Sequence, residues 1–83
     1  MKRIELRNVP AADVAHYLLT LFDGVTQPDG TISGEGWHVR FEDGEPVVFK
    51  PATRVPVLFI NITGPRTDET AAFIIRKTMR GGG

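Results

Sequence analysis

The sequence predicts an α+β fold, in which an antiparallel sheet of four to five strands carries two helices on one face. Two stretches, near residues 10–25 and 67–80, have the three- and four-residue apolar spacing of amphipathic helices. The residues between them form short runs of apolar side chains that are separated by glycine and proline turns, as expected of strands. Strands grouped between two helices indicate an α+β sandwich in the order β-α-β-β-β-β-α.

The length and composition are those of one small domain. We expect a single domain over residues 1–80 and a flexible glycine tail at residues 81–83. The absence of cysteine excludes a disulfide framework, a thiolate metal site and a thiol nucleophile. Ten basic residues balance ten acidic ones, and no apolar run reaches the length of a membrane span. We therefore expect a cytoplasmic protein that binds neither nucleic acid nor membranes.

The first strand leads directly into the first helix. Residues 4–9 alternate apolar and polar side chains, as in a strand with one buried face. Pro10 fits the first position of a helix, where a missing N–H group costs nothing. Gly24 is the predicted stop of this helix. Its apolar stripe consists of Val14, Leu18, Leu21, Phe22 and Val25.

A short strand and a longer one follow the first helix. Turns at residues 28–30 and 34–36 bracket a candidate strand at residues 31–33. Residues 37–42 then place apolar side chains on one face and polar side chains on the other. The dipeptide Asp43-Gly44 predicts a two-residue hairpin that pairs this strand with the next one.

The last two strands and the second helix complete the predicted order. Residues 46–50 form the second arm of the hairpin, and residues 55–62 form the most apolar strand. Because that strand is apolar on both faces, we expect it either to curl until both are covered or to pack one face against a partner. Thr67 is a suitable cap for the second helix, whose predicted inner face consists of Ala71, Ile74, Ile75 and Met79.

Several short segments together resemble a known family. They are Val39-Arg40-Phe41, Glu45-Pro46, the apolar strand from Pro56 to Ile62, and the ending Arg80-Gly81-Gly82-Gly83. The chain resembles, over nearly its whole length, the carboxyl-terminal domain of proteins related to the molybdopterin synthase small subunit. The resemblance implies a TATA-box-binding-protein-like α+β fold and an association with sulfur transfer for cofactor synthesis. In such relatives a β-grasp carrier domain precedes this one; these 83 residues contain no counterpart of it, so we do not expect an inherited carrier role.

The terminal glycines form the first candidate site. Gly81, Gly82 and Gly83 resemble the tail of a sulfur carrier or ubiquitin-like modifier, because a tail without side chains can thread into an activating enzyme. The competing interpretation is a helix stop at Gly81 with a frayed end. That interpretation is favoured because β-grasp carriers have the order β-β-α-β, whereas here a helix follows the first strand.

A polar sheet face forms the second candidate site. His38, Arg40 and Glu42 share one strand face, and the predicted hairpin would bring basic residues of the next strands beside them. The residues predicted to bind an anionic ligand or a protein carboxylate are His38, Arg40, Lys50 and Arg54. The alternative is a solvated face of Arg–Glu pairs, each worth under about 1 kcal/mol.

The remaining hypotheses concern ligands and catalysis. A small molecule would find a cavity between helices and sheet lined by Trp37, Phe41, Phe59 and Tyr17, although core packing is the favoured role of these side chains. His16 and His38 lack partners at ligand or triad spacing, and the sole serine, Ser33, lies outside any nucleophile motif. We therefore predict no catalytic residue, metal or cofactor.

The sequence thus favours a non-enzymatic module that binds another protein or itself, as a homodimer. The two alternatives are a carrier that acts through its terminal glycines and a small-ligand binder that uses the helix–sheet cleft.

Overall fold

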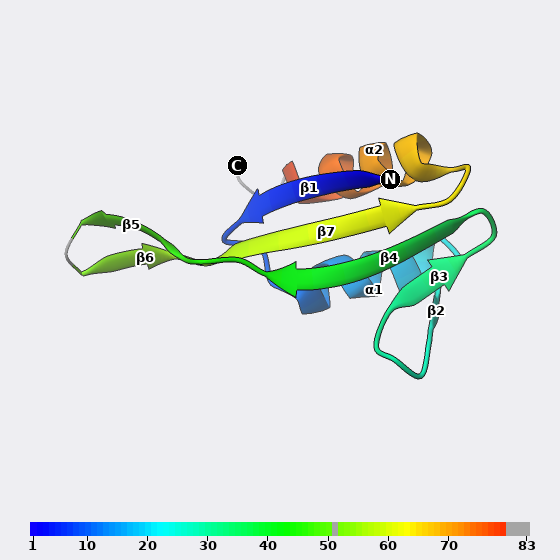
Figure 1. Cartoon of the computed structure of the whole chain (residues 1–83), viewed down its shortest axis with the longest axis horizontal. Helices are drawn as coiled ribbons and strands as arrows, with labels where there is room; N and C mark the ends of the chain where they lie inside the picture. Colours follow the sequence, from blue (N-terminus) through cyan, green and yellow to red (C-terminus); the bar gives the residue numbers. More distant parts are fainter. Residues whose placement is uncertain (51, 80–83) are drawn as a thin grey trace.

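The structure is a computed structural model that describes residues 1–50 and 52–79. It confirms the predicted class, because two helices lie on one side of an antiparallel five-stranded sheet (Figure 1). A separate two-stranded ribbon, β5–β6, extends away from this sheet. The elements in chain order are β1 (Lys2–Arg7), α1 (Ala11–Leu21), β2 (Val25–Thr26), β3 (Ile32–Gly34), β4 (Trp37–Asp43), β5 (Val47–Lys50), β6 (Thr53–Val55), β7 (Val57–Thr63) and α2 (Thr67–Met79).

The central strand of the sheet is β7, the last strand in the sequence. The strand order is β1-β7-β4-β3-β2, so β7 pairs with β1 on one side and with β4 on the other. Side chains directly opposite each other share a face, which places Ile60 beside Phe41 and Ile62 beside Val39 on the helix side. The core therefore lies between the inner face of β7 and the two helices.

The core consists of buried aliphatic and aromatic side chains from both layers. The sheet contributes Ile32, Trp37, Val39, Leu58, Ile60 and Ile62, and the helices contribute Val14, Leu18, Ala71, Phe73 and Ile74. The Phe22 ring stacks on that of Phe73, with the ring centroids 4.4 Å apart. The predicted helix faces are correct in their centres, but the outermost positions, Leu21, Val25 and Met79, are exposed.

The first helix ends earlier than predicted. It stops at Leu21, and Val25 forms the short strand β2 with its side chain 61% exposed. The residue that adopts the left-handed conformation after the helix is Asp23 (φ 58°), whereas the sequence predicted Gly24 as the stop. Gly24 is instead required for close packing, because a Cβ atom there would lie 2.8 Å from the Trp37 ring.

The predicted hairpin at Asp43-Gly44 is wrong. Strand β4 pairs with β7, and the amide of Gly44 donates to the carbonyl of Val57 at 2.9 Å. Strand β5 pairs with β6, so the segment predicted as one strand over residues 55–62 is divided at Pro56. Pairing β4 with the long apolar β7 buries more apolar surface than pairing it with the four-residue β5, which explains the outcome.

The outer face of β7 is covered by the chain itself, so its apolar character does not require a partner. Val57 is only 6% exposed on this face. A Cβ atom on Gly44 would lie 2.5 Å from the Phe59 ring and 3.0 Å from Val57, which shows how closely the backbone crosses them. The guanidinium of Arg3 lies 4.1 Å from the centre of the Phe59 ring. Within the described residues, no helix is long and apolar enough to cross a membrane.

Two glycines with positive φ provide a test of the packing at the end of β7. Gly64 (φ 111°) lies so close to the turn at Gly36 that a Cβ atom would be 2.5 Å from the Gly36 carbonyl oxygen. Gly30 (φ 88°) has no atom within 4 Å of that position. We expect Gly30→Ala to lower the free energy of unfolding by roughly 1–2 kcal/mol through backbone strain alone. Gly64→Ala should lower it by about 3 kcal/mol or more in urea titration, because strain adds to a backbone clash. Equal losses for the two variants would contradict the proposed packing.

Candidate functional site

The outer face of the sheet carries the polar side chains of β4, as predicted. His38 and Arg40 point away from the helices, opposite Thr63 and Asn61 of β7. Asn61 also lies opposite Arg3 of β1, so two arginines flank it. The sheet therefore brings His38 and Arg40 together on one face.

Most groups around Asn61 are already engaged with one another. Glu42 accepts a hydrogen bond from the Asn61 amide at 3.3 Å and one from the Arg3 guanidinium at 3.5 Å. The Asn61 Oδ1 atom is buried and has no partner within the described residues. Arg40 is exposed and forms no ion pair within residues 1–50 and 52–79. Arg40 is therefore the basic side chain of this face that is free to meet a carboxylate.

His38 contributes to the structure of a turn. Its Nε2 atom lies 3.0 Å from the hydroxyl oxygen of Thr31. That hydroxyl donates to a carboxylate oxygen of Asp29 at 2.6 Å, so Nε2 is the donor to Thr31. The hydrogen bonds from the side chain and backbone of Thr31 lower the pKa of Asp29 below its ordinary value of 3.8. This chain of contacts ties β4 to the turn before β3.

The other two predicted binding residues lie elsewhere. Lys50 ends β5 and Arg54 lies in β6, so both belong to the ribbon and not to the face of His38 and Arg40. The predicted group of four is thus divided into two pairs, because the hairpin that would have joined them does not form.

The β5–β6 ribbon has an exposed apolar side chain as well as exposed cations. Val48 is 57% exposed and lies directly opposite Arg54, so the two share one face of the ribbon. In the described part of the chain, each strand of the ribbon pairs only with the other. An isolated two-stranded ribbon is marginally stable in water, so this element would gain stability from a covering partner.

A cavity of about 230 Å³ lies at the base of the ribbon, where the chain leaves β4 and returns to β7. Its lining is mostly apolar, and Asp43 is the one charged residue that lines it in the described part of the chain. The lining residues are Asn8, Val9, Pro10, Ala11, Asp43, Pro56, Val57 and Leu58.

The ligand cavity expected between helices and sheet is not formed by the predicted residues. Trp37 is buried in the core, whereas Phe59 lies on the opposite face of the sheet beneath Arg3. Tyr17 instead lines a cavity of about 260 Å³ together with Arg7 and Lys77. The four side chains therefore do not enclose a common site.

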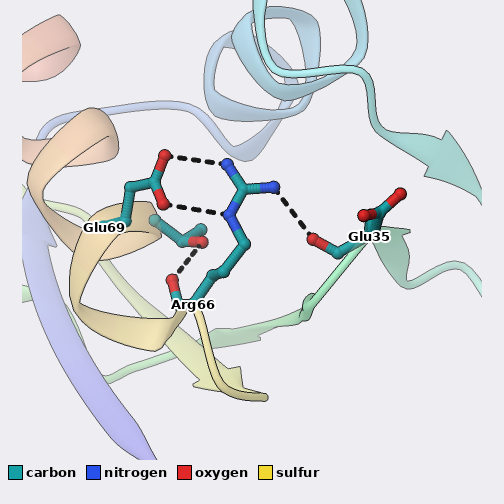
Figure 2. Close-up of polar contacts among 4 residues, drawn as sticks. Glu35, Arg66 and Glu69 are labelled. Atoms are coloured by element: carbon teal, nitrogen blue, oxygen red, sulfur yellow. Dashed lines mark hydrogen bonds and ion pairs between the residues drawn. The ribbon is translucent and has the colours of Figure 1, made fainter.

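Sequence reasoning missed the most complete polar cluster, which centres on Arg66 (Figure 2). Its guanidinium donates to both carboxylate oxygens of Glu69, at 2.9 and 2.8 Å, and to the backbone carbonyl of Glu35 at 2.9 Å. It also lies 5.3 Å from the centre of the Phe22 ring. The only local signal was the three-residue spacing of Arg66 and Glu69 at the start of a helix. Because these contacts engage all three guanidinium nitrogens and three of their five N–H groups, we assign Arg66 a structural role that joins the turn at residues 34–36 to α2.

Two further kinds of candidate site are a metal centre and the glycine tail. No cluster of three or more His, Asp or Glu side chains that could hold a metal ion occurs among the residues that the structure describes. The predicted tail residues Gly81, Gly82 and Gly83 lie outside the described residues, beyond the end of α2 at Met79.

The Arg66–Glu69 pair predicts a pH dependence of stability. The hydrogen bond from Arg66 lowers the pKa of Glu69 below its ordinary value of 4.5. A carboxylate with a lowered folded-state pKa stabilises the fold above its unfolded pKa, and this contribution is lost as the pH falls through the folded value. We expect Glu69→Gln to lower the thermal midpoint at pH 7, with the difference from the unmodified protein shrinking below about pH 4.5. Asp68→Asn is the matched control, because Asp68 shares the first turn of α2 but pairs with Lys2 instead. A difference that persisted unchanged to pH 2 would contradict this assignment.

Comparison with known proteins agrees with the resemblance noted from the sequence. A family model described as archaeal MoaD-like protein matches residues 2–83. No curated protein matches the chain significantly. The family match confirms the predicted relation to the molybdopterin synthase small subunit and suggests a small protein related to sulfur carriers. Because the match covers nearly the whole chain, the protein belongs to the archaeal MoaD-like protein family.

Proposed function

We propose that this protein is a non-enzymatic accessory module of sulfur-carrier or molybdenum-cofactor chemistry, which acts by binding a protein through its folded surface. The observation that carries the proposal is the β5–β6 ribbon, which leaves the sheet and whose two strands pair with each other and with no other described strand. Such a ribbon is poorly stabilised alone, so an interaction that covers it would be favourable. Membership of a MoaD-like family supports the association with sulfur transfer.

The chemistry of the exposed side chains supports recognition of a protein carboxylate. Arg54 and Lys50 are exposed on the ribbon, and Arg40 is exposed on the outer sheet face. Arginine can bind a carboxylate through two parallel hydrogen bonds, which gives direction as well as attraction. Val48, beside Arg54, adds apolar surface that the same partner would bury.

A second candidate function is a sulfur carrier that acts through its terminal glycines. It is favoured by the sequence Gly81-Gly82-Gly83 and by a family match that extends to residue 83. In this function an adenylating enzyme would activate the carboxylate of Gly83. The fold argues against it, because α1 follows β1 directly and the order is not the β-β-α-β of a β-grasp carrier.

Affinity capture from a lysate of the source organism distinguishes the two functions. The baits are the full chain, a chain that ends at Arg80, and the ribbon variant Val48→Asp. We expect the first two to recover the same sulfur-transfer or adenylating enzyme, identified by mass spectrometry, and Val48→Asp to recover at least about tenfold less, because a buried carboxylate is costly.

The matched control is Leu21→Asp, which places the same charge at a side chain on α1 that is exposed to a similar degree, 56% against 57%. It should capture as much partner as the full chain. Recovery that depends on the glycines and not on Val48 would favour the carrier function instead.

A further inference from the structure

The ribbon and the cavity at its base have complementary chemistry. The ribbon face formed by Val48 and Arg54 offers one aliphatic side chain and one cation. The cavity is lined by apolar groups such as Val9 and Pro56, together with the carboxylate of Asp43. An aliphatic side chain can enter such a cavity while the neighbouring guanidinium pairs with the carboxylate at its rim.

The ribbon of a given chain is poorly placed to occupy its own cavity. The chain enters the ribbon after Asp43 and leaves it through Pro56, both of which line the cavity, and the ribbon extends away from that point (Figure 1). A second copy related by a two-fold axis removes this obstacle. In that arrangement two ribbons run antiparallel, and the two ribbon-to-base contacts form together because the interface is isologous.

We propose that two copies of this chain form a two-fold dimer in which the Val48–Arg54 face of each ribbon docks into the base cavity of the other, with Arg54 paired to Asp43. This inference rests on the proposed function: the second copy is the protein that covers Val48, and the enzyme captured in a Val48-dependent manner then binds the dimer. Val48 lies opposite Arg54, which is two residues from the cavity-lining Pro56, or about 7 Å along the strand at roughly 3.3 Å per residue. This short distance sets the separation of the two cavities.

Electrostatics and size both agree with a weak dimer. The formal net charge is zero, so no long-range repulsion opposes the approach of two copies. Within each copy Lys50 ends β5 near the tip of the ribbon and Arg54 lies at the centre of β6, while Asp43 and Glu45 precede β5 at the base. Antiparallel ribbons therefore align opposite charges at both ends. An interface of two short ribbons is small, so we expect a dissociation constant on the order of micromolar.

Charge exchange tests the dimer by sedimentation equilibrium from micromolar to millimolar concentration. Arg54→Asp places a carboxylate opposite Asp43 of the second copy, and Asp43→Arg places a cation opposite Arg54. We expect each variant alone to dimerise at least about tenfold more weakly than the unmodified chain, because like charges then meet at both contacts. A mixture of equal amounts of the two variants should recover the dimer, since each contact between unlike copies again joins opposite charges.

This recovery in the mixture cannot result from a change in folding, because it requires the two variants to meet. Arg76→Asp, an exposed arginine on α2, is the control substitution and should leave dimerisation unchanged. Circular dichroism of each variant verifies the fold. An unmodified chain that stays monomeric at every concentration, or a mixture that fails to recover the dimer, would overturn the proposal. A monomeric chain that still captures a sulfur-transfer enzyme in a Val48-dependent manner would refute the dimer alone and leave the proposed function standing.

Discussion

The rest of the structure depends on the double pairing of β7. This strand is the last in the sequence, yet it joins β1 on one side and β4 on the other. Its inner side chains Leu58, Ile60 and Ile62 form the floor on which both helices pack. The sheet is therefore complete only when residues distant in sequence have met, and the entropy of closing those loops is offset mainly by this one apolar strand.

The projecting ribbon is a consequence of the same pairing. Because β4 continues along β7 to Asp43, the strands β5 and β6 have no neighbouring strand in the main sheet as far as the structure describes it. They pair with each other instead, and Pro56, which has no N–H group, marks the point where the chain rejoins the sheet. The surface that we propose for protein binding thus arises from topology and not from a local motif.

A second set of contacts fixes the opposite end of the sheet. The bidentate pair of Arg66 with Glu69, together with the bond to the carbonyl of Glu35, joins the start of α2 to the turn before β4 (Figure 2). Gly64 and Gly36 pack against each other in the same region without space for a side chain. The two ends of the molecule therefore differ: one is closed by polar and backbone contacts, and the other carries the ribbon and its cavity.

The sequence by itself determined the α+β class, the helix faces around Val14 and Leu18, and the outward direction of His38 and Arg40, because these follow from the periodicity of local structure. Only the tertiary structure decided which strands pair. The turn signal at Asp43-Gly44 contributes less to stability than the burial of β4 against β7, so the predicted hairpin does not form. Lys50 and Arg54 are therefore separated from His38 and Arg40. The role of Arg66 was likewise hidden, because its carbonyl partner at Glu35 is distant in sequence and such contacts leave no local pattern.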